Sequence, residues 1–230
     1  MIEKFCYNTL VRYIELANYL FSIKDQKHAE FSGNLSNSDY IVIGVKNPIL
    51  RDLIKEHYKD TDLRLEDFEC SKYLEVDFIY FGIGLKRCKT IEEQLELLDK
   101  NIKYAKSWAV TDTINHSLKK CSFDLFWEFF LSHYKSEHIY TRRFSYIFGL
   151  MFYKDERILK IFKYLNENDE YMVMMAEAWL LATVAITYPK QVFTLLKTLK
   201  DQKLKLKTIS KICDSFRFTE EQKEQFKTLR

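Results

Sequence analysis

Apolar-rich stretches of this chain alternate with short polar connections, and the connections carry clear helix-start signals. The signals are N-cap residues and prolines at a first helical position. They stand at Asn47-Pro48, Thr90–Glu93, Ser122, Pro189 and Thr219–Gln222. Thr90–Glu93 has the spacing of a capping box. The remaining helices are predicted over residues 2–23, 49–58, 66–85, 107–119, 140–152, 170–187 and 204–216. The polar segment 25–38 is predicted to be a loop.

Helix pairs recur from about residue 66 onward, and this recurrence predicts the fold class. The pairs begin near residues 66, 107, 139, 170 and 204, a spacing of roughly 31–41 residues that is typical of HEAT-like repeats. One pair cannot bury its apolar faces alone, whereas stacked pairs bury a continuous core. The sequence therefore predicts an all-α HEAT-like helical-repeat solenoid with a concave face. No linker rich in Pro, Gly or Ser interrupts it, so we expect a single domain over residues 1–230.

Composition supports the helical prediction and narrows the functional classes. The chain of 230 residues has only 5 Gly and 2 Pro, too few for the many turns of a sandwich or barrel. It is 47% hydrophobic and 30% charged, which argues against disorder. The net charge of +3 permits binding to a polyanion without requiring it.

Cysteine usage and the apolar segments indicate a soluble cytoplasmic protein. The five cysteines are widely spaced without a CxxC pair, so we expect them to be reduced core residues. The N-terminus lacks the pattern of a signal peptide. The longest apolar stretch, residues 171–186, contains Glu177 and is too short to cross a bilayer.

Motifs for nucleotide, metal and serine-nucleophile chemistry are absent from the sequence. The five histidines are scattered, and none lies at metal-ligand spacing from a cysteine. We therefore expect no cofactor and no metal. Any chemistry must come from carboxylates, aromatic residues and basic residues brought together across helices.

One such constellation is visible at the helix starts of successive repeats. Trp108 and Asp112 are four residues apart, so they share one helix face. Arg142 and Arg143 open the corresponding helix of the next repeat, and Trp179 lies on the one after it. Together they suggest a slot with a carboxylate, aromatic walls and a cationic rim. The alternative is that Trp108 packs in the core while Asp112 bonds a neighbouring helix.

The chain resembles the bacterial DNA alkylation repair family of HEAT-like proteins, the alkylpurine DNA glycosylases of the AlkD type, and most of all its shorter subgroup. The resemblance covers nearly the whole chain. Its most specific segments are SWAVTD at 107–112 and MAEAWLL at 175–181. Further matching segments are IGVKNPILR at 43–51, YTRRF at 140–144 and SKICDSFR at 210–217.

The resemblance implies a concave face that cradles duplex DNA and hydrolysis of the N-glycosidic bond of N3- and N7-alkylated purines. It implies that Trp108, Asp112 and Trp179 surround the deoxyribose, with Arg143 near the backbone phosphate. The expected partner is alkylated duplex DNA, bound without a base-flipping pocket. The sequence leaves the oligomeric state open, and we expect a monomer. Further candidates for DNA binding are Arg142, Lys106, Lys46 and Arg51.

Two features leave the functional prediction open. The segment around Trp179 contains Glu177 but no Lys or Arg, whereas active relatives place basic residues there. A basic run, with lysines at 197, 200, 203, 205, 207 and 211, could compensate or could be an ordinary solvated helix face. The alternative function is a helical-repeat module, catalytically weak or inactive, that binds damaged or branched DNA or a protein.

Overall fold

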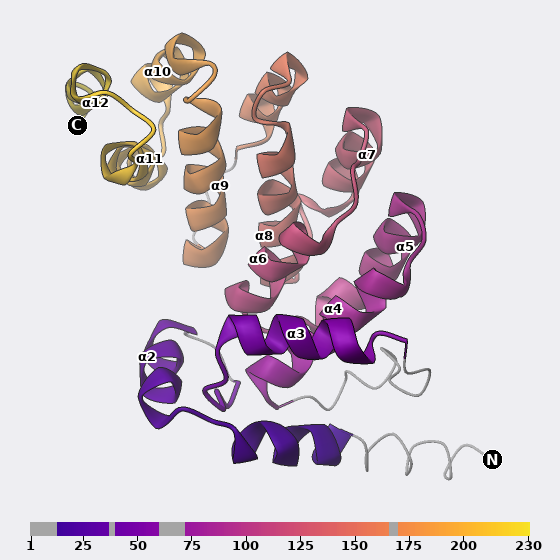
Figure 1. Cartoon of the computed structure of the whole chain (residues 1–230). Coiled ribbons are helices and arrows are strands. Elements are labelled where there is room, and N and C mark those ends of the chain that lie inside the picture. The colour runs from indigo at the N-terminus through magenta and orange to yellow at the C-terminus, as the bar shows by residue number, and fades with distance from the viewer. Residues whose placement is uncertain (1–12, 37–39, 60–71, 166–169) are drawn as a thin grey trace. The chain divides into compact units, whose positions relative to one another are not determined.

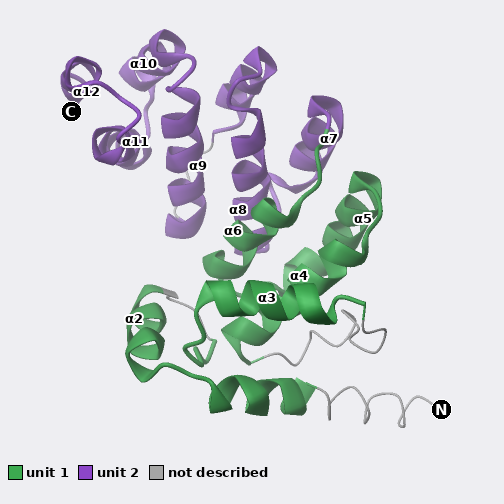
Figure 2. Ribbon diagram, viewed as in Figure 1, with its two compact units in different colours: residues 1–121 green, residues 122–230 purple. Residues whose placement is uncertain are grey.

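The computed structural model of this chain describes residues 13–36, 40–59, 72–165 and 170–230 (Figure 1). Helices make up nearly all of this described part, with one isolated bridge between Ile41 and Tyr73. The predicted all-α class is therefore confirmed. The chain divides into two compact units, residues 1–121 and residues 122–230, which are coloured separately in Figure 2. The single domain expected from the sequence stays a prediction.

Unit 1 is built around one buried helix. It contains a helix over residues 13–22, α2 (Gln26–Ser36), α3 (Asn47–His57), α4 (Leu74–Arg87), α5 (Ile91–Asn101), the short 3-10 helix η2 (Ile102–Tyr104) and α6 (Trp108–Ser117). Every residue of α4 from Glu75 to Leu85 is buried. Helices α3 and α6 both pack against α4. Burial on all sides explains why α4 reads as an almost continuous apolar run.

Unit 2 stacks successive helices in the manner of a helical repeat. Its elements are α7 (Phe123–His133), α8 (Ile139–Phe148), η3 (Gly149–Phe152), η4 (Glu156–Tyr164), α9 (Tyr171–Val184), α10 (Pro189–Thr198), α11 (Gln202–Asp214) and α12 (Glu220–Lys227). Helix α9 packs against both α8 and α11, as the neighbouring ribbons in Figure 1 show. This stacking is what the recurring helix pairs predicted.

The predicted helix starts are largely confirmed. Ser122 accepts a hydrogen bond from the Leu125 N–H at 3.2 Å, and Thr219 forms a complete capping box with Gln222. Pro189 opens α10.

Two details at the helix starts differ from the prediction. Asn47 is the first residue of α3, and Lys46 takes the N-cap position with extended backbone. Thr90 accepts the Glu93 N–H, but the Glu93 carboxylate binds the Lys89 N–H, so the reciprocal bond of a capping box is missing.

The predicted loop over residues 25–38 is wrong, because residues 26–36 form α2. Asp25 starts this helix: its carboxylate accepts the His28 N–H at 3.1 Å, and its carbonyl accepts the Ala29 N–H at 2.9 Å. The facing backbone at Gly44 has φ 101°. A Cβ there would lie 2.5 Å from the Asp25 carbonyl oxygen, so only glycine permits this close approach.

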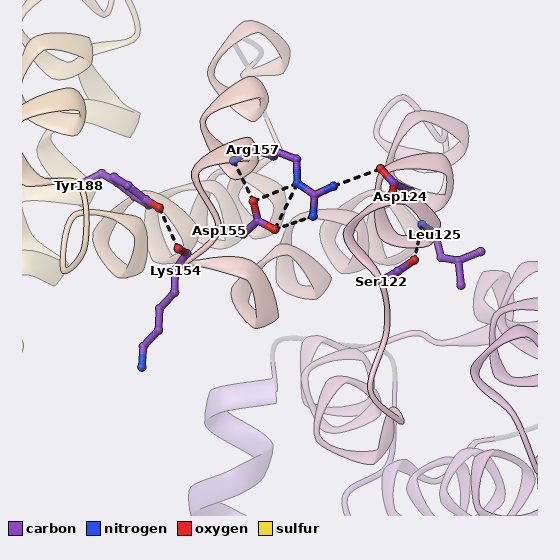
Figure 3. A network of polar contacts seen from close by, with 7 residues as sticks. All are labelled: Ser122, Asp124, Leu125, Lys154, Asp155, Arg157 and Tyr188. Carbon is purple, nitrogen blue, oxygen red and sulfur yellow. Dashed lines mark hydrogen bonds and ion pairs between the residues drawn. The ribbon is translucent and has the colours of Figure 1, made fainter.

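Unit 2 also contains η4, a 3-10 helix that the sequence pattern did not predict, and a polar network holds its start (Figure 3). Arg157 binds both carboxylate oxygens of Asp155 and reaches Asp124 of α7 at 3.4 Å. Its guanidinium also lies 4.5 Å from the Phe123 ring centroid. The Tyr188 hydroxyl, just before α10, donates to the Lys154 carbonyl at 2.8 Å. These contacts tie the start of η4 to α7 and to the start of α10.

Cys88, Cys121 and Cys213 form no disulfide, and they are partly exposed, so they are not the core residues that the sequence predicted. Cys6 and Cys70 lie outside the described residues. Within the described ranges, no helix combines the length and apolar character needed to cross a membrane.

Candidate functional site

Trp108 and Asp112 lie on α6, and both side chains are partly exposed. The buried residues of this helix are Val110, Thr111 and Ile114, so neither candidate belongs to its core face. The Ser107 side chain caps α6 by accepting the Ala109 N–H at 3.2 Å. The Thr111 hydroxyl donates to the Trp108 carbonyl at 3.1 Å and lies 3.5 Å from a carboxylate oxygen of Asp112.

The Trp108 indole is held by α2, the helix that the sequence pattern missed. Its Nε1 donates to the Leu35 carbonyl at 3.1 Å. Phe31 and Leu35 of α2 are both largely exposed, at 64% and 51%. The C-terminal half of α2 therefore contacts Trp108 and carries two exposed apolar side chains. Since α2 was predicted as a loop, this neighbour was not foreseen.

The start of α6 is fixed by a buried tyrosine–aspartate pair. The Tyr40 hydroxyl donates to Asp77 of α4 and accepts the Lys106 N–H at 3.1 Å. Burial raises the pKa of Tyr40 well above its ordinary value, and the negative charge of Asp77 adds to the effect. Tyr40 therefore stays protonated and keeps its donor. The Lys106 ammonium lies 5.9 Å from the Tyr40 ring centroid.

Tyr40 and Asp77 were not predicted to matter for the site. The available signal was Asp77 itself, since a charge inside an apolar helical run must find a partner when it is buried. The partner is 37 residues away in the chain, and no local pattern connects the two.

Lys46 and Arg51, both predicted to bind DNA, lie at the start and middle of α3. The Lys46 ammonium pairs with Asp25 at 3.2 Å. The pKa of Asp25 is lowered first by the hydrogen bond from the His28 N–H and then by Lys46. The loop before α3 is clamped by Glu75, which accepts the N–H groups of Ile43, Gly44 and Val45. Arg51 is exposed.

In unit 2, the two predicted arginines open α8 and differ in exposure. Arg143 is only 5% exposed, and its Nη1 donates to the Met172 carbonyl in the first turn of α9 at 2.6 Å. Arg142 is partly exposed, although its Nε is buried and has no hydrogen-bond partner. The Met172 bond makes Arg143 part of the α8–α9 packing.

Trp179 is partly exposed on α9, and a lysine of α11 accompanies it. The Lys211 ammonium lies 5.9 Å from the Trp179 ring centroid, and Lys207 lies 6.0 Å from that of Tyr171. Helix α11 therefore places two lysines beside α9, and that they compensate for the basic residues absent from α9 stays a prediction. Two lysines of the basic run face aromatic rings of α9, and the sequence could not show this pairing.

Glu177, whose role was left open, is fully buried on α9. It lies close to Tyr146 of α8, and its negative charge adds to burial in raising the Tyr146 pKa above its ordinary value. The Tyr146 hydroxyl donates to the Tyr164 carbonyl at 2.8 Å. Glu177 is therefore a buried residue of the α8–α9 packing and not part of an exposed surface.

The structure groups the candidates in two sets. Lys106, Trp108 and Asp112 are together at the start of α6 in unit 1. Arg142, Arg143 and Trp179 are on the packed helices α8 and α9 of unit 2. The convergence of both sets on one concave face stays a prediction. In the described part of the chain, no three His, Cys, Asp or Glu side chains are grouped as a metal site requires.

The sequence matches the family model of the DNA alkylation repair enzymes over residues 16–211. The chain belongs to this family. The match includes both sets of candidate residues. A search of curated protein sequences found no match.

Comparison with solved structures supports the fold. A structure described as a predicted DNA alkylation repair enzyme from Enterococcus faecalis is similar to this chain with a TM-score of 0.63 and 17% sequence identity. The similarity covers 84% of this chain and 96% of that one. At this identity the likeness concerns the fold. Family membership supports a role in DNA repair, with DNA as the partner.

Proposed function

We propose that this protein hydrolyses the N-glycosidic bond of cationic N3- and N7-alkylated purines in duplex DNA, without a base-flipping pocket. The observation that carries the proposal is the pair on α6. Asp112 and Trp108 are both partly exposed, one helical turn apart, within the residues that match the repair family. A carboxylate and an indole on one helix face suit a cationic sugar.

The chemistry requires little more than charge stabilisation. Alkylation at N3 or N7 makes the purine cationic, so it leaves as a neutral base without being protonated. Positive charge then develops on the deoxyribose in an oxocarbenium-like transition state. A fixed Asp112 carboxylate stabilises that charge and orients the attacking water, while indole faces add attraction to the developing cation.

The remaining candidates take supporting roles in this proposal. Trp179 forms the second aromatic wall, and Lys211 beside its ring provides positive charge for a nearby phosphate. In unit 2, the DNA phosphates are contacted by Arg142 and Arg143. In unit 1, they are contacted by Lys46, Arg51 and Lys106. A guanidinium carries five N–H donors, so binding the Met172 carbonyl with one of them is compatible with this role.

The test is release of free base from duplex DNA that carries 7-methylguanine. The wild-type protein is expected to release the base above the spontaneous rate under single-turnover conditions. Asp112→Asn keeps the shape but removes the charge, so the rate should fall by about 10²-fold, the usual effect of removing one electrostatic contact to a transition state. Asp99→Asn, an exposed aspartate on α5, is the matched control and should retain the wild-type rate.

The outcomes separate two functions. The alternative is a module that binds damaged or branched DNA, or a protein, without chemistry. It is favoured by the burial of Arg143 and by the bond between Trp108 and Leu35, which commit both side chains to internal contacts. No release above background, together with DNA binding, would support the module. Release that is equal in Asp112→Asn would refute the role of Asp112.

A further inference from the structure

Unit 1 contains a cavity of about 530 Å³ between α3, α4 and α6, here called the basic pocket. Four cationic side chains line it: Arg51, Lys55, Lys86 and Lys119. Among the described residues that line it, none is an aspartate or a glutamate. Its volume is in the range of small-molecule sites. Only Arg51 was singled out from the sequence, so the pocket itself is a structural finding.

Three of these cations form no ion pair with a carboxylate in the described part of the chain, and only Lys55 does. Lys55 pairs with Asp52 at 2.8 Å, and the Lys86 ammonium lies 4.7 Å from the Tyr58 ring centroid. Among the described residues, Arg51 and Lys119 form neither an ion pair nor a cation–π contact with an aromatic ring. An exposed guanidinium and an ammonium that line one cavity attract an anion, and the guanidinium fits the geometry of a phosphate.

The ends of three helices must be weighed against this positive charge. Lys55, Lys86 and Ser117 belong to the last turns of α3, α4 and α6. Each helix C-terminus carries roughly half a negative charge. The three helix ends and the Asp52 carboxylate together carry less negative charge than the four cations carry positive charge. The pocket therefore keeps a net positive charge. Basic residues that served only to neutralise the helix ends would leave no such excess.

The wall of the pocket is held by a buried glutamine. Gln94 of α5 is 1% exposed, and its amide donates to the Leu85 carbonyl at 2.8 Å and to the Ser117 carbonyl at 3.2 Å. Its side-chain oxygen accepts the Lys119 N–H at 2.8 Å. One amide thus joins the ends of α4 and α6 and fixes the backbone of Lys119.

Part of the pocket lining is apolar and tightly packed. A Cβ on Gly82 would lie 2.2 Å from the Ile54 side chain, so α3 and α4 meet closely there. Ile54, Gly82 and Leu85 line the pocket together with the cationic side chains. A lining that combines apolar and cationic side chains suits a ligand that carries both a sugar or base and a phosphate.

We propose that the basic pocket binds a nucleotide through its phosphate, with Arg51 and Lys119 as the principal contacts. The phosphate belongs either to the DNA backbone or to a free nucleotide, and the chemistry of recognition is the same. The inference rests on the charges and packing of unit 1 and does not depend on cleavage of a glycosidic bond.

The experiment compares ligands that differ in the phosphate. Calorimetry at low salt measures binding of 2′-deoxyguanosine 5′-monophosphate, 2′-deoxyguanosine and undamaged duplex DNA to the full chain. Arg51→Glu and Lys119→Glu are each expected to lower the affinity for the phosphate-bearing ligand by 10-fold or more. Lys27→Glu, an exposed lysine of α2 outside the pocket, has the same charge change and should leave affinity unaltered. The unphosphorylated nucleoside should not bind.

The outcomes distinguish the source of the phosphate. Loss of both mononucleotide and DNA binding in the pocket variants identifies a nucleotide site that DNA also uses, whereas loss of DNA binding alone identifies the backbone as the ligand. Equal affinities of the pocket variants and Lys27→Glu, or no binding of either phosphate ligand by wild type, would overturn the proposal. Arg51→Gln and Lys119→Gln, with thermal melts, exclude misfolding. Base release from 7-methylguanine DNA, measured separately, reports on Asp112 and not on this pocket.

Discussion

Two buried carboxylates of α4 show how single residues position the candidate site. Glu75 holds the loop that leads into α3, and Asp77 holds Tyr40, whose hydroxyl accepts the Lys106 N–H at the start of α6. They are only 3% and 0% exposed. A buried charge is costly unless hydrogen bonds satisfy it, so these residues act as anchors for the helix starts that carry the candidates.

Glu75→Gln should destabilise the protein although the glutamine side chain has the same shape as glutamate. One Glu75 oxygen accepts the N–H groups of Gly44 and Val45, and the other accepts that of Ile43. Glutamine replaces one of these acceptors with an NH₂ group that faces an N–H donor. We expect a loss of about 2–3 kcal/mol in the free energy of unfolding by urea. Glu56→Gln, an exposed change on α3, should alter it by less than about 0.5 kcal/mol. Equal effects of the two variants would contradict the anchoring role.

At the residue scale, the sequence predicts only what lies within a helical turn. The shared face of Trp108 and Asp112 follows from their spacing alone. The contact of Lys211 with Trp179 joins two helices and depends on how α9 and α11 pack. The burial of Arg143 has the same origin, since its partner is a carbonyl at the start of α9. Pairings of this kind require the fold.

Helix starts are the elements that the sequence predicts best, because a cap is a bond between residues three positions apart. Ser122 and Thr219 behave as predicted for this reason. Helix α2 was missed because its residues are largely polar, and its start is stabilised by Asp25 and by the facing Gly44 backbone. The 3-10 helix η4 was missed although Ile158 and Ile161 are buried three residues apart.

The cap of α8 should make stability depend on pH. The His138 Nδ1 accepts the Thr141 N–H at 3.2 Å, which only the neutral ring can do. Burial lowers the pKa of His138 below its ordinary value of 6.5. The unfolded chain therefore takes up the proton first as pH falls. The contribution of the cap, about 1 kcal/mol, is present above pH 6.5 and is lost as pH falls through the lowered pKa.

Thermal melts between pH 7.5 and pH 5 measure this loss. His138→Asn replaces the ring with a cap that does not titrate, so its melting temperature should fall less than that of wild type over the same range. His133→Asn is the matched control. The His133 Nδ1 lies 2.9 Å from the Phe129 carbonyl, to which a protonated ring can still donate. Parallel pH profiles of wild type and His138→Asn would rule out the titrating cap.

The charge of the whole molecule decides how it can bind DNA. A net charge of +3 gives little general attraction to a polyanion, so affinity must come from local clusters of cations. Such clusters occur within each unit: the basic pocket in unit 1, and the α11 lysines beside the α9 aromatic rings in unit 2. The composition predicted the small net charge of the molecule, but only the packed helices show where the positive charge is concentrated.

The salt dependence of DNA binding shows whether the α11 lysines contact DNA phosphates or form an ordinary solvated helix face. Each phosphate neutralised on B-DNA contributes about −0.9 to the slope of log affinity against log salt. The double variant Lys207→Gln/Lys211→Gln should therefore reduce the slope by roughly 1–2. Lys223→Gln/Lys227→Gln removes the same charge from α12, where both lysines already pair with glutamates at 2.8 and 2.6 Å, and should leave the slope unchanged. If both double variants reduced the slope equally, α11 would be a solvated face, and DNA contacts of unit 2 would have to be sought elsewhere.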